Sequence, residues 1–465
     1  MWTDNSDRTQ MSALLREMRD RLPDDVDRSV FDRLVDEAHE FVGSHNILTT
    51  EQYDAVMMLL SHASGAHAVV SGVAGSGKTS VVARLVSMFH LAAHRKVLVA
   101  AFTNTATRRA MDALGGTATA FMTLHSAFMK AYDRPRVMWV RDQRTGKMVE
   151  KRSNEVAFVR ADNPPCASFN VVIVDEASMV SRELADIVRK VVHPGAVIIA
   201  VGDQNQLPPV VTEGEYGFGF DLPNALVRLR VNNRAKFETD VMVSNILDGR
   251  RLPKPGKLPP HDVPGAFVSR RNIAFIDAAL NDPLDDVQIL VGTHKTRGVL
   301  LRRLRRDLPP VEIGNRLRCR TTSKEASLSA GDELVVVSVG RVVGLEVLHL
   351  GEIVSEKCVE IVGRMGRTEV SVFVPLRALT GDCIDNSSDF QGLTGWARDC
   401  DKYSRLPVVY AHHAFIDTVH AAQGNQWDHV VVMADDCPNP NEPTFARQWL
   451  YTAASRARQR LDIFK

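Results

Sequence analysis

The sequence predicts an α/β fold built from parallel, doubly wound sheets, with more than one core. Apolar strands alternate with helical segments from about residue 49 to residue 230, as at 97–102, 171–174 and 196–201, and this alternation is typical of parallel sheets. A second alternating stretch begins at 287–291, resumes at 414–434 and ends in a helix at 445–458 and a strand at 461–464. Because single cores rarely exceed about 250–300 residues, the chain of 465 residues should form two large lobes.

Residues 72–79 read Gly-Val-Ala-Gly-Ser-Gly-Lys-Thr and are the most informative segment of the chain. An apolar run at 67–71 precedes them and a helical pattern at 80–89 follows, which is the setting of a phosphate-binding loop. Backbone N–H groups of such a loop surround the phosphates, and the helix directs its positive end at them. We expect Lys78 to reach the β- and γ-phosphates and Thr79 to bind Mg²⁺. The predicted nucleotide-binding residues here are Gly72, Val73, Ala74, Gly75, Ser76, Gly77, Lys78, Thr79 and Ser80.

Two carboxylates stand at the end of a second strand, within the segment 169–178. The continuous apolar run before them suits a parallel strand that is covered on both faces. Asp175 is expected to hold Mg²⁺ through water, and Glu176 to orient and deprotonate the attacking water. Together with the loop at 72–79, this pair predicts that the chain binds and hydrolyses a nucleoside triphosphate.

Composition favours a cytoplasmic enzyme. The net charge is only +1, so a polyanion would be held by local basic patches rather than by the whole surface. Six cysteines are scattered without paired spacing, which indicates reduced thiols and argues against a zinc site. No stretch reaches about 18 uninterrupted apolar residues, and the amino terminus does not read as a secretion signal.

Two insertions interrupt the alternating pattern. Residues 133–160 predict a β-hairpin, with seven basic and two acidic residues between Arg134 and Arg152. Its alternative interpretation is a solvated hairpin with a charged face. Residues 316–407 contain short Val-rich strands at 333–339, 341–348, 353–362 and 368–374, separated by Gly turns, which predicts a small β-barrel. Residues 1–48 show helical periodicity with dense charge and predict a helical extension.

Further polar residues are candidates for contact with the γ-phosphate. Gln206, in the segment 201–210, could sense this phosphate by hydrogen bonding, and Asp203 could brace its loop. Arg456 and Arg234 are candidates for an arginine finger, which stabilises transition-state charge and contributes about 10³–10⁵ in rate. Each arginine could instead form a surface ion pair, and for Arg234 alone that interpretation is the stronger.

Taken in order, these segments resemble the motif series of superfamily 1 helicases, specifically the 5′-to-3′ branch with RecD-like and Dda-like enzymes. The resemblance covers about residues 47–465 and is best at 72–79, 175–178, 202–208, 418–424 and 451–458. It implies two RecA-like domains, at 49–230 and at 231–315 with 408–465, and the cofactors ATP and Mg²⁺. It also implies that Gln52 reads the adenine base and that Gly424 contacts the nucleotide.

The same resemblance implies a single-stranded DNA path across both lobes. The basic hairpin would be the strand-separating pin, and the insertion at 316–407 would be an SH3-like module. Asn425 stands where relatives commonly carry Ser or Thr, and Ser455 where Thr is usual. His125 and His420 could be packed histidines, and Trp139 and Trp396 could be core residues. The implied DNA-binding residues are Thr103, Asn104, His125, Trp139, His294, Thr418 and His420.

The sequence therefore predicts an ATP-dependent DNA helicase that moves 5′ to 3′ on single-stranded DNA and unwinds forks in replication, recombination or repair. We expect it to act as a monomer, with replication or recombination proteins as partners and no membrane association. Three alternatives stay open: an RNA helicase, since backbone contacts do not encode sugar identity; a DNA-stimulated translocase that does not unwind; and an ATP-gated binding scaffold.

Overall fold

A computed structural model of the protein describes residues 67–83, 95–114, 118–141, 148–160, 163–208, 226–229, 238–260, 263–280, 286–349, 352–382, 396–399 and 405–465, with Asp20, Glu51, Gln52, Ala55, Leu59 and Val86. The chain divides into two compact units. The first is Met1–Lys130 with Arg160–Ala235, and the second is Ala131–Val159 with Lys236–Lys465. The helical extension predicted at 1–48 lies outside the described residues, apart from Asp20.

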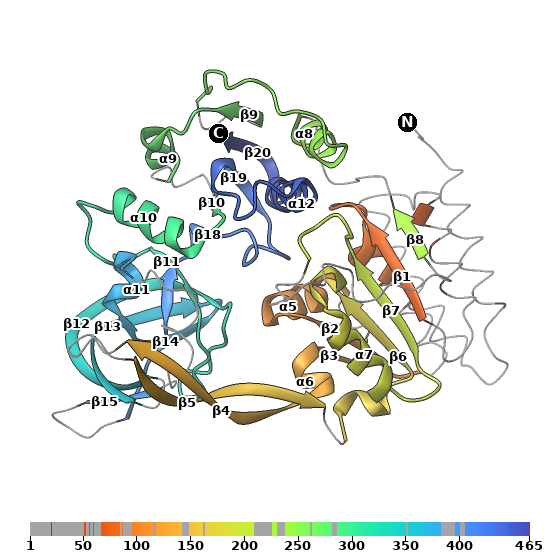
Figure 1. Ribbon diagram of the computed structural model, residues 1–465, viewed down its shortest axis with the longest axis horizontal. Coiled ribbons are helices and arrows are strands. Elements are labelled where there is room, and N and C mark those ends of the chain that lie inside the picture. The colour runs from red at the N-terminus through yellow and green to blue at the C-terminus, as the bar shows by residue number, and fades with distance from the viewer. Residues whose placement is uncertain are drawn as a thin grey trace. The chain divides into compact units, whose positions relative to one another are not determined.

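The first unit is built on a six-stranded parallel sheet with the strand order β3-β2-β6-β7-β1-β8 (Figure 1). Strand β7 lies between β1 and β6, so the carboxyl ends of these three strands meet at the same end of the sheet. The elements are β1 (His67–Gly72), η1 (Lys78–Ala83), β2 (Val97–Ala101), α5 (Asn104–Leu114), β3 (Ala120–Thr123), α6 (Leu124–Phe128), η3 (Pro165–Ser168), β6 (Val171–Asp175), η4 (Ala177–Met179), α7 (Arg182–Val191), β7 (Val197–Gly202) and β8 (Leu226–Leu229).

The strands of this sheet are buried because helices cover them. Every residue of β2 and β6 is buried, as expected for parallel strands with both faces covered. Helices α6 and α7 pack on one face, where Phe128 and Val188 join one cluster with Leu98 and Val172 of the strands. The predicted parallel sheet is therefore confirmed. Its core holds the strand ends in fixed positions for the site.

Strands β4 (Met129–Arg141) and β5 (Met148–Arg160) form a separate two-stranded sheet, which is the backbone of the predicted hairpin. Most of this hairpin, Ala131–Val159, groups with the second compact unit.

The second unit contains a five-stranded parallel sheet with the order β18-β10-β19-β20-β9 (Figure 1). Helices α9 and α10 pack on one face of it, and α8 and α12 pack together beside β20. The elements are α8 (Glu238–Leu247), β9 (Gly265–Ser269), α9 (Ile273–Leu280), β10 (Val287–Val291), α10 (His294–Leu304), β18 (Ile416–Thr418), β19 (Trp427–Met433), η5 (Ala434–Asp436), α12 (Pro443–Ala454) and β20 (Ala457–Phe464).

An antiparallel sheet is inserted between α10 and β18 of this unit, with the order β14-β13-β12-β11-β17. Strand β15 also pairs with β12, and β16 pairs with β15. Strands β14 and β17 lie at opposite edges of this sheet. The segment just before β17 nevertheless contacts β14, because the Val409 N–H donates to Phe373 O, 3.0 Å away. The elements are β11 (Arg316–Cys319), β12 (Glu333–His349), β13 (Glu352–Met365), β14 (Thr368–Pro375), α11 (Leu376–Thr380), β15 (Trp396–Asp399), β16 (Arg405–Pro407) and β17 (Ala411–His413).

Three predicted boundaries are wrong. The strands predicted at 333–339 and 341–348 are one strand, β12, because the chain passes Gly340 as an irregularity in pairing with β13 rather than as a turn. The helix predicted at 445–458 ends at Ala454, and β20 begins at Ala457 rather than at 461. No helix within the described ranges is long and apolar enough to cross a membrane.

Candidate nucleotide and DNA site

The loop at 73–77, between β1 and η1, has a conformation that requires its glycines. Gly75 and Gly77 have φ values of 81° and 78°, in the left-handed region that glycine enters without steric cost. A Cβ atom on Gly72 would lie 2.8 Å from Leu229 Cβ and 2.6 Å from Ser76 Oγ. The close approach of β8 therefore excludes a side chain at the start of the loop.

Two side chains bond to carbonyl oxygens of this loop. Lys78 Nζ donates to Gly72 O at 2.6 Å and to Val73 O at 3.0 Å, so the ammonium lies folded over the loop. Gln52 Nε2 donates to Ser76 O at 2.8 Å, and the Gln52 side chain is buried. The structure thus brings Gln52 against the loop from far upstream in the sequence.

The two predicted Mg²⁺ ligands, Thr79 and Asp175, are hydrogen-bonded to each other. The Thr79 hydroxyl donates to Asp175 Oδ1 at 2.9 Å. Burial, together with the neighbouring charge of Glu176, raises the pKa of Asp175 to about 7, although Thr79 and Lys78 act in the opposite direction. A hydroxyl and a carboxylate are oxygen donors of the kind that Mg²⁺ selects, so these residues fit the metal. In the described part of the chain, His, Cys, Asp and Glu form no cluster of three or more that could hold a metal ion by themselves.

Glu176 follows β6 directly and has a left-handed backbone, with φ 51° and ψ 41°. This conformation costs a residue with a Cβ atom about 1–2 kcal/mol. Such strain persists only where surrounding structure imposes it, and here η4 begins at the next residue. The turn sends the half-buried Glu176 side chain in a direction that a regular continuation of the strand would not give.

Gln206 lies in the turn after β7. Strand β7 lies between β1, which leads into the loop at 73–77, and β6, which ends at Asp175. Its N–H donates to Asp203 O at 3.1 Å, and Asp203 Oδ1 accepts from the Asn205 N–H at 3.0 Å. Asp203 therefore braces the turn, as predicted. Gln206 Oε1 and Ser76 Oγ are buried but have no hydrogen-bond partner within the described ranges. Buried polar atoms are usually paired, so both atoms suit a bound ligand or water.

The predicted DNA-binding residues of the first unit lie at the ends of the neighbouring strands β2 and β3. Thr103 Oγ1 accepts from the Ala106 N–H at 3.1 Å at the start of α5, where Asn104 is exposed. The ring of His125, at the start of α6, lies 5.6 Å from the ring of Phe102. Burial lowers the pKa of His125. The structure thus brings the two segments together.

The predicted DNA-binding residues of the second unit also follow adjacent strands. Thr418 is the last residue of β18 and stands opposite Val291, the last residue of β10. His294 begins α10 three residues after Val291. The pKa of His294 is lowered to about 4, chiefly by burial and then by nearby charges that include Arg297, Arg320 and His420. Burial also lowers the pKa of His420. At neutral pH His294 is therefore uncharged.

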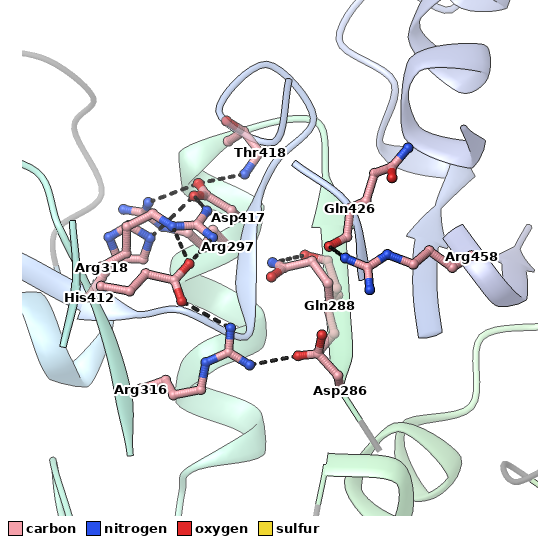
Figure 2. Close-up of polar contacts among 12 residues, drawn as sticks. Asp286, Gln288, Arg297, Arg316, Arg318, His412, Asp417, Thr418, Gln426 and Arg458 are labelled. Atoms are coloured by element: carbon pink, nitrogen blue, oxygen red, sulfur yellow. Dashed lines mark hydrogen bonds and ion pairs between the residues drawn. The ribbon is translucent and has the colours of Figure 1, made fainter. Parts of the chain in front are cut away.

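Thr418 is attached to a network of buried charges (Figure 2). Asp417 is fully buried, and its Oδ1 accepts from the Thr418 N–H at 2.8 Å. Arg318 of β11 donates to Asp417 Oδ2 at 2.6 Å and to Glu333 Oε1 at 2.6 Å. Burial alone would raise the pKa of Asp417, but His412, Arg318 and Arg320 hold it well below its ordinary range.

An acidic side chain occupies the start of α10. Asp436 Oδ2 accepts from the N–H groups of Gly292 at 2.6 Å and Thr293 at 3.2 Å. Its Oδ1 accepts from the Thr296 hydroxyl at 2.5 Å. A carboxylate at a helix N-terminus is stabilised by unpaired N–H groups and by the helix dipole. The turn after β10 is thereby closed by an anion from within the chain.

Arg456 lies in the turn between α12 and β20 and is 3% exposed. Its guanidinium donates to Thr452 O at 2.9 Å, Asn425 O at 3.3 Å and Ser455 Oγ at 3.0 Å. These bonds hold Arg456 to the segment that contains Gly424, whose φ of 75° is left-handed. The surface position considered as an alternative for Arg456 is therefore wrong, because the side chain is buried.

Two predicted site residues cannot be placed in this way. Arg234 lies outside the described residues. The structure describes the backbone of Trp139 within β4.

Sequence reasoning missed Asp417, Arg318 and Asp436. Only Asp417 carried a signal, because a carboxylate inside an otherwise apolar strand must find a partner. Nothing in the sequence identified that partner.

Two protein families match the chain. The family described as AAA domain matches residues 52–212, and the family described as UvrD-like helicase C-terminal domain matches residues 413–463. These matches and the RecD relative described next support the resemblance to superfamily 1 helicases that the motifs indicated.

The relatives are distant. The RecBCD enzyme subunit RecD of Mycobacterium tuberculosis is 25% identical over 420 residues, which cover 85% of this chain and 66% of that protein. The chain thus matches slightly less than two thirds of the length of that relative. Conjugal transfer protein TraA of Agrobacterium fabrum is 24% identical over 436 residues, covering 91% of this chain and 33% of that protein. The Pif1 helicase structure from Candida albicans has a TM-score of 0.44 and 19% identity, covering 90% of this chain and 95% of that one.

Proposed function

We propose that this chain, similar to RecD-like helicases of superfamily 1, is an ATP-dependent DNA helicase that moves 5′ to 3′ on single-stranded DNA. The observation that carries the proposal is the convergence of three strand ends in the first unit. Loop 73–77 follows β1, the Gln206 turn follows β7, and Asp175 with Glu176 ends β6. ATP chemistry needs a phosphate cradle, a metal site and a base for water, and this arrangement supplies all three.

Each residue of the first unit has a defined task in this proposal. Phosphates approach the loop, and Lys78 exchanges its two carbonyl partners for phosphate oxygens. Thr79 and Asp175 would hold Mg²⁺, which would neutralise phosphate charge when bound. Glu176 accepts the proton of the attacking water. Gln206 Oε1, buried without a partner in the described ranges, accepts a hydrogen bond from that water. Gln52, attached to the loop, reads the adenine base.

The remaining groups come from both units. Arg456 of the second unit, held beside Gly424, contributes positive charge to the γ-phosphate, and Arg234, outside the described residues, is the second candidate for that task. DNA contacts come from Thr103, Asn104 and His125 in the first unit, and from His294, Thr418 and His420 in the second, with Trp139 on the hairpin. We further propose RecA-like domains at 49–230 and at 231–315 with 408–465, a pin at 133–160 and an SH3-like module at 316–407.

The test is unwinding of a fluorescent DNA fork with either a 5′ or a 3′ single-stranded tail, in ATP and Mg²⁺. We expect unwinding only from the 5′ tail. The proposed biological role is in DNA replication, recombination or repair. Unwinding from the 3′ tail would keep a helicase but overturn the direction. DNA-stimulated ATP hydrolysis without unwinding would leave a translocase. Greater stimulation by RNA than by DNA oligonucleotides would favour the RNA helicase instead.

A further inference from the structure

A buried arginine, Arg318, is one of the residues that join the inserted antiparallel sheet to the parallel sheet of the second unit. Arg318 stands in β11 opposite Glu333 of β12 and His412 of β17, and its side chain is 5% exposed. Two guanidinium nitrogens, Nε and Nη2, donate to Glu333 Oε1, at 3.2 Å and 2.6 Å. A buried arginine is retained only where its donors are paired. The two bonds to Glu333 therefore hold the Arg318 side chain within the inserted sheet.

The same guanidinium reaches both ends of the segment 418–426. At its start, Arg318 Nη1 donates to Asp417 Oδ2 at 2.6 Å, and Asp417 Oδ1 accepts from the Thr418 N–H at 2.8 Å (Figure 2). At its end, Arg318 Cζ lies 5.8 Å from the centre of the Trp427 ring, within the range of a cation–π contact.

The far end of this segment leads to Arg456. The Trp427 N–H donates to Arg456 O at 3.0 Å, and Arg456 Nη1 donates to Asn425 O at 3.3 Å. Between the two ends lie Thr418, His420 and Gly424, the residues proposed for DNA and nucleotide. One side chain of the insertion is thus in contact with both residues that flank this segment.

We infer that Arg318 is a positioning residue, which clamps segment 418–426 and sets the position of Thr418 for its DNA contact. The inference rests on the proposed function and deepens it, because it gives the insertion a part in DNA binding through a buried contact. Arg316, two residues earlier, is the natural comparison. It pairs with Asp286 at 2.6 Å and with the same Glu333 at 2.9 Å, but it is half-exposed. Within the described structure these side-chain bonds go to Asp286 and Glu333 and not to Asp417 or Trp427.

The test compares Arg318→Lys with Arg316→Lys. Lysine keeps the charge beside Asp417, so the fold should be retained, but its single ammonium cannot meet Glu333, Asp417 and the Trp427 ring together. Amide hydrogen exchange in peptides that cover 418–427 should be about tenfold faster in Arg318→Lys and unchanged in Arg316→Lys. Equal exchange in the two variants would overturn the clamp.

A second readout addresses function. In Arg318→Lys, the concentration of single-stranded DNA that gives half-maximal stimulation of ATP hydrolysis should rise about tenfold, while the KM for ATP stays within about twofold. Arg316→Lys should change neither value. Faster exchange with an unchanged DNA requirement would overturn the link to DNA binding. If DNA did not stimulate the unmodified protein at all, the proposed function would fail, while the exchange experiment would still decide whether Arg318 clamps the segment.

Discussion

In each parallel sheet a helical segment follows one strand: η1 follows β1 in the first unit, and α10 follows β10 in the second. The two sheets differ in what lies at the N-terminus of that segment. In the first unit, residues 73–77 form a glycine-shaped loop between β1 and η1, with Lys78 folded over it. In the second unit, only Gly292 and Thr293 separate β10 from α10, and Asp436 occupies the helix start. Backbone N–H groups at a helix start attract an anion in either case. Under the proposed function, the first sheet leaves this position for phosphate, whereas the second fills it with its own carboxylate.

The largest effect should come from the first sheet, in Glu176→Gln. Loss of the base should reduce DNA-stimulated ATP hydrolysis by about 10²–10⁴, while binding of ATP is retained because the loop is unchanged. Steady-state hydrolysis and titration with a fluorescent ATP analogue measure the two quantities. Glu183→Gln, in the first turn of α7, is the matched control and should be neutral. Unchanged turnover in Glu176→Gln would favour the scaffold alternative.

Alanine at one glycine in each sheet should separate ligand binding from folding. At Gly292, a Cβ atom would lie 1.7 Å from Asp436 O, so Gly292→Ala should lower the free energy of unfolding by about 3 kcal/mol or more. At Gly72, the crowding with Leu229 is less severe, and Gly72→Ala should mainly displace the loop and weaken ATP binding by about 10- to 100-fold. Gly256→Ala is the control, since nothing lies within 4 Å of its Cβ position. Thermal unfolding measures the change in stability, and nucleotide titration measures the change in ATP binding. A loss of stability in Gly72→Ala with weaker ATP binding in Gly292→Ala would contradict the prediction.

Removing the internal anion should make the second sheet resemble the first. Asp436→Ala loses three hydrogen bonds to a carboxylate and should lower the free energy of unfolding by about 2 kcal/mol. Inorganic sulfate should then stabilise the variant more than the unmodified protein, because the helix start has lost its anion. Asp435→Ala is the control, since its ion pair with Arg271 is exposed and contributes about 1 kcal/mol or less. If sulfate stabilises both proteins equally, the comparison between the sheets is wrong.

The smallest effect per step of the measurement is a pH dependence of metal binding at the first sheet. The pKa of Asp175 is raised from 3.8 to about 7, so the folded, ligand-free protein binds the extra proton between these values and loses stability as the pH rises through them. Metal binding requires the ionised carboxylate, and the affinity for Mg²⁺ with ADP should rise by at most about tenfold per pH unit up to pH 7 and then level off. Calorimetric titration should give a flat profile for Asp175→Asn. Asp417 stays ionised throughout this range, so this carboxylate of the second sheet should contribute no such change.

The sequence was most informative where function resides in contiguous residues. Loop 73–77 and the Asp175–Glu176 pair were predicted because their chemistry depends on local spacing and on the strands that precede them. The left-handed turn at Glu176 was not, because a non-glycine residue gives no local sign of positive φ. Gly340 was interpreted as a turn, although in an antiparallel pair a single glycine also permits an irregularity with strong twist.

Contacts between distant residues were beyond prediction. Arg318 and Asp417 are 99 residues apart, and Asp436 and Gly292 are 144 apart. Each of these residues alone is one charged or small side chain among many. The early end of α12 has the same kind of cause, because pairing of β20 with β19 and β9 determines where the strand begins, and this overrides a helical pattern that continues to Arg458.

The place of β20 in its sheet has a consequence for biosynthesis. This strand lies between β19 and β9, and Arg460 pairs with Gly265. A ribosome therefore releases β9 long before the strand that will hold it, and the whole antiparallel insertion emerges in between. Until β20 is synthesised, β9 lacks its partner strand, and its unpaired edge can associate with other strands. Chaperone binding during synthesis is most needed for the interval between these two strands.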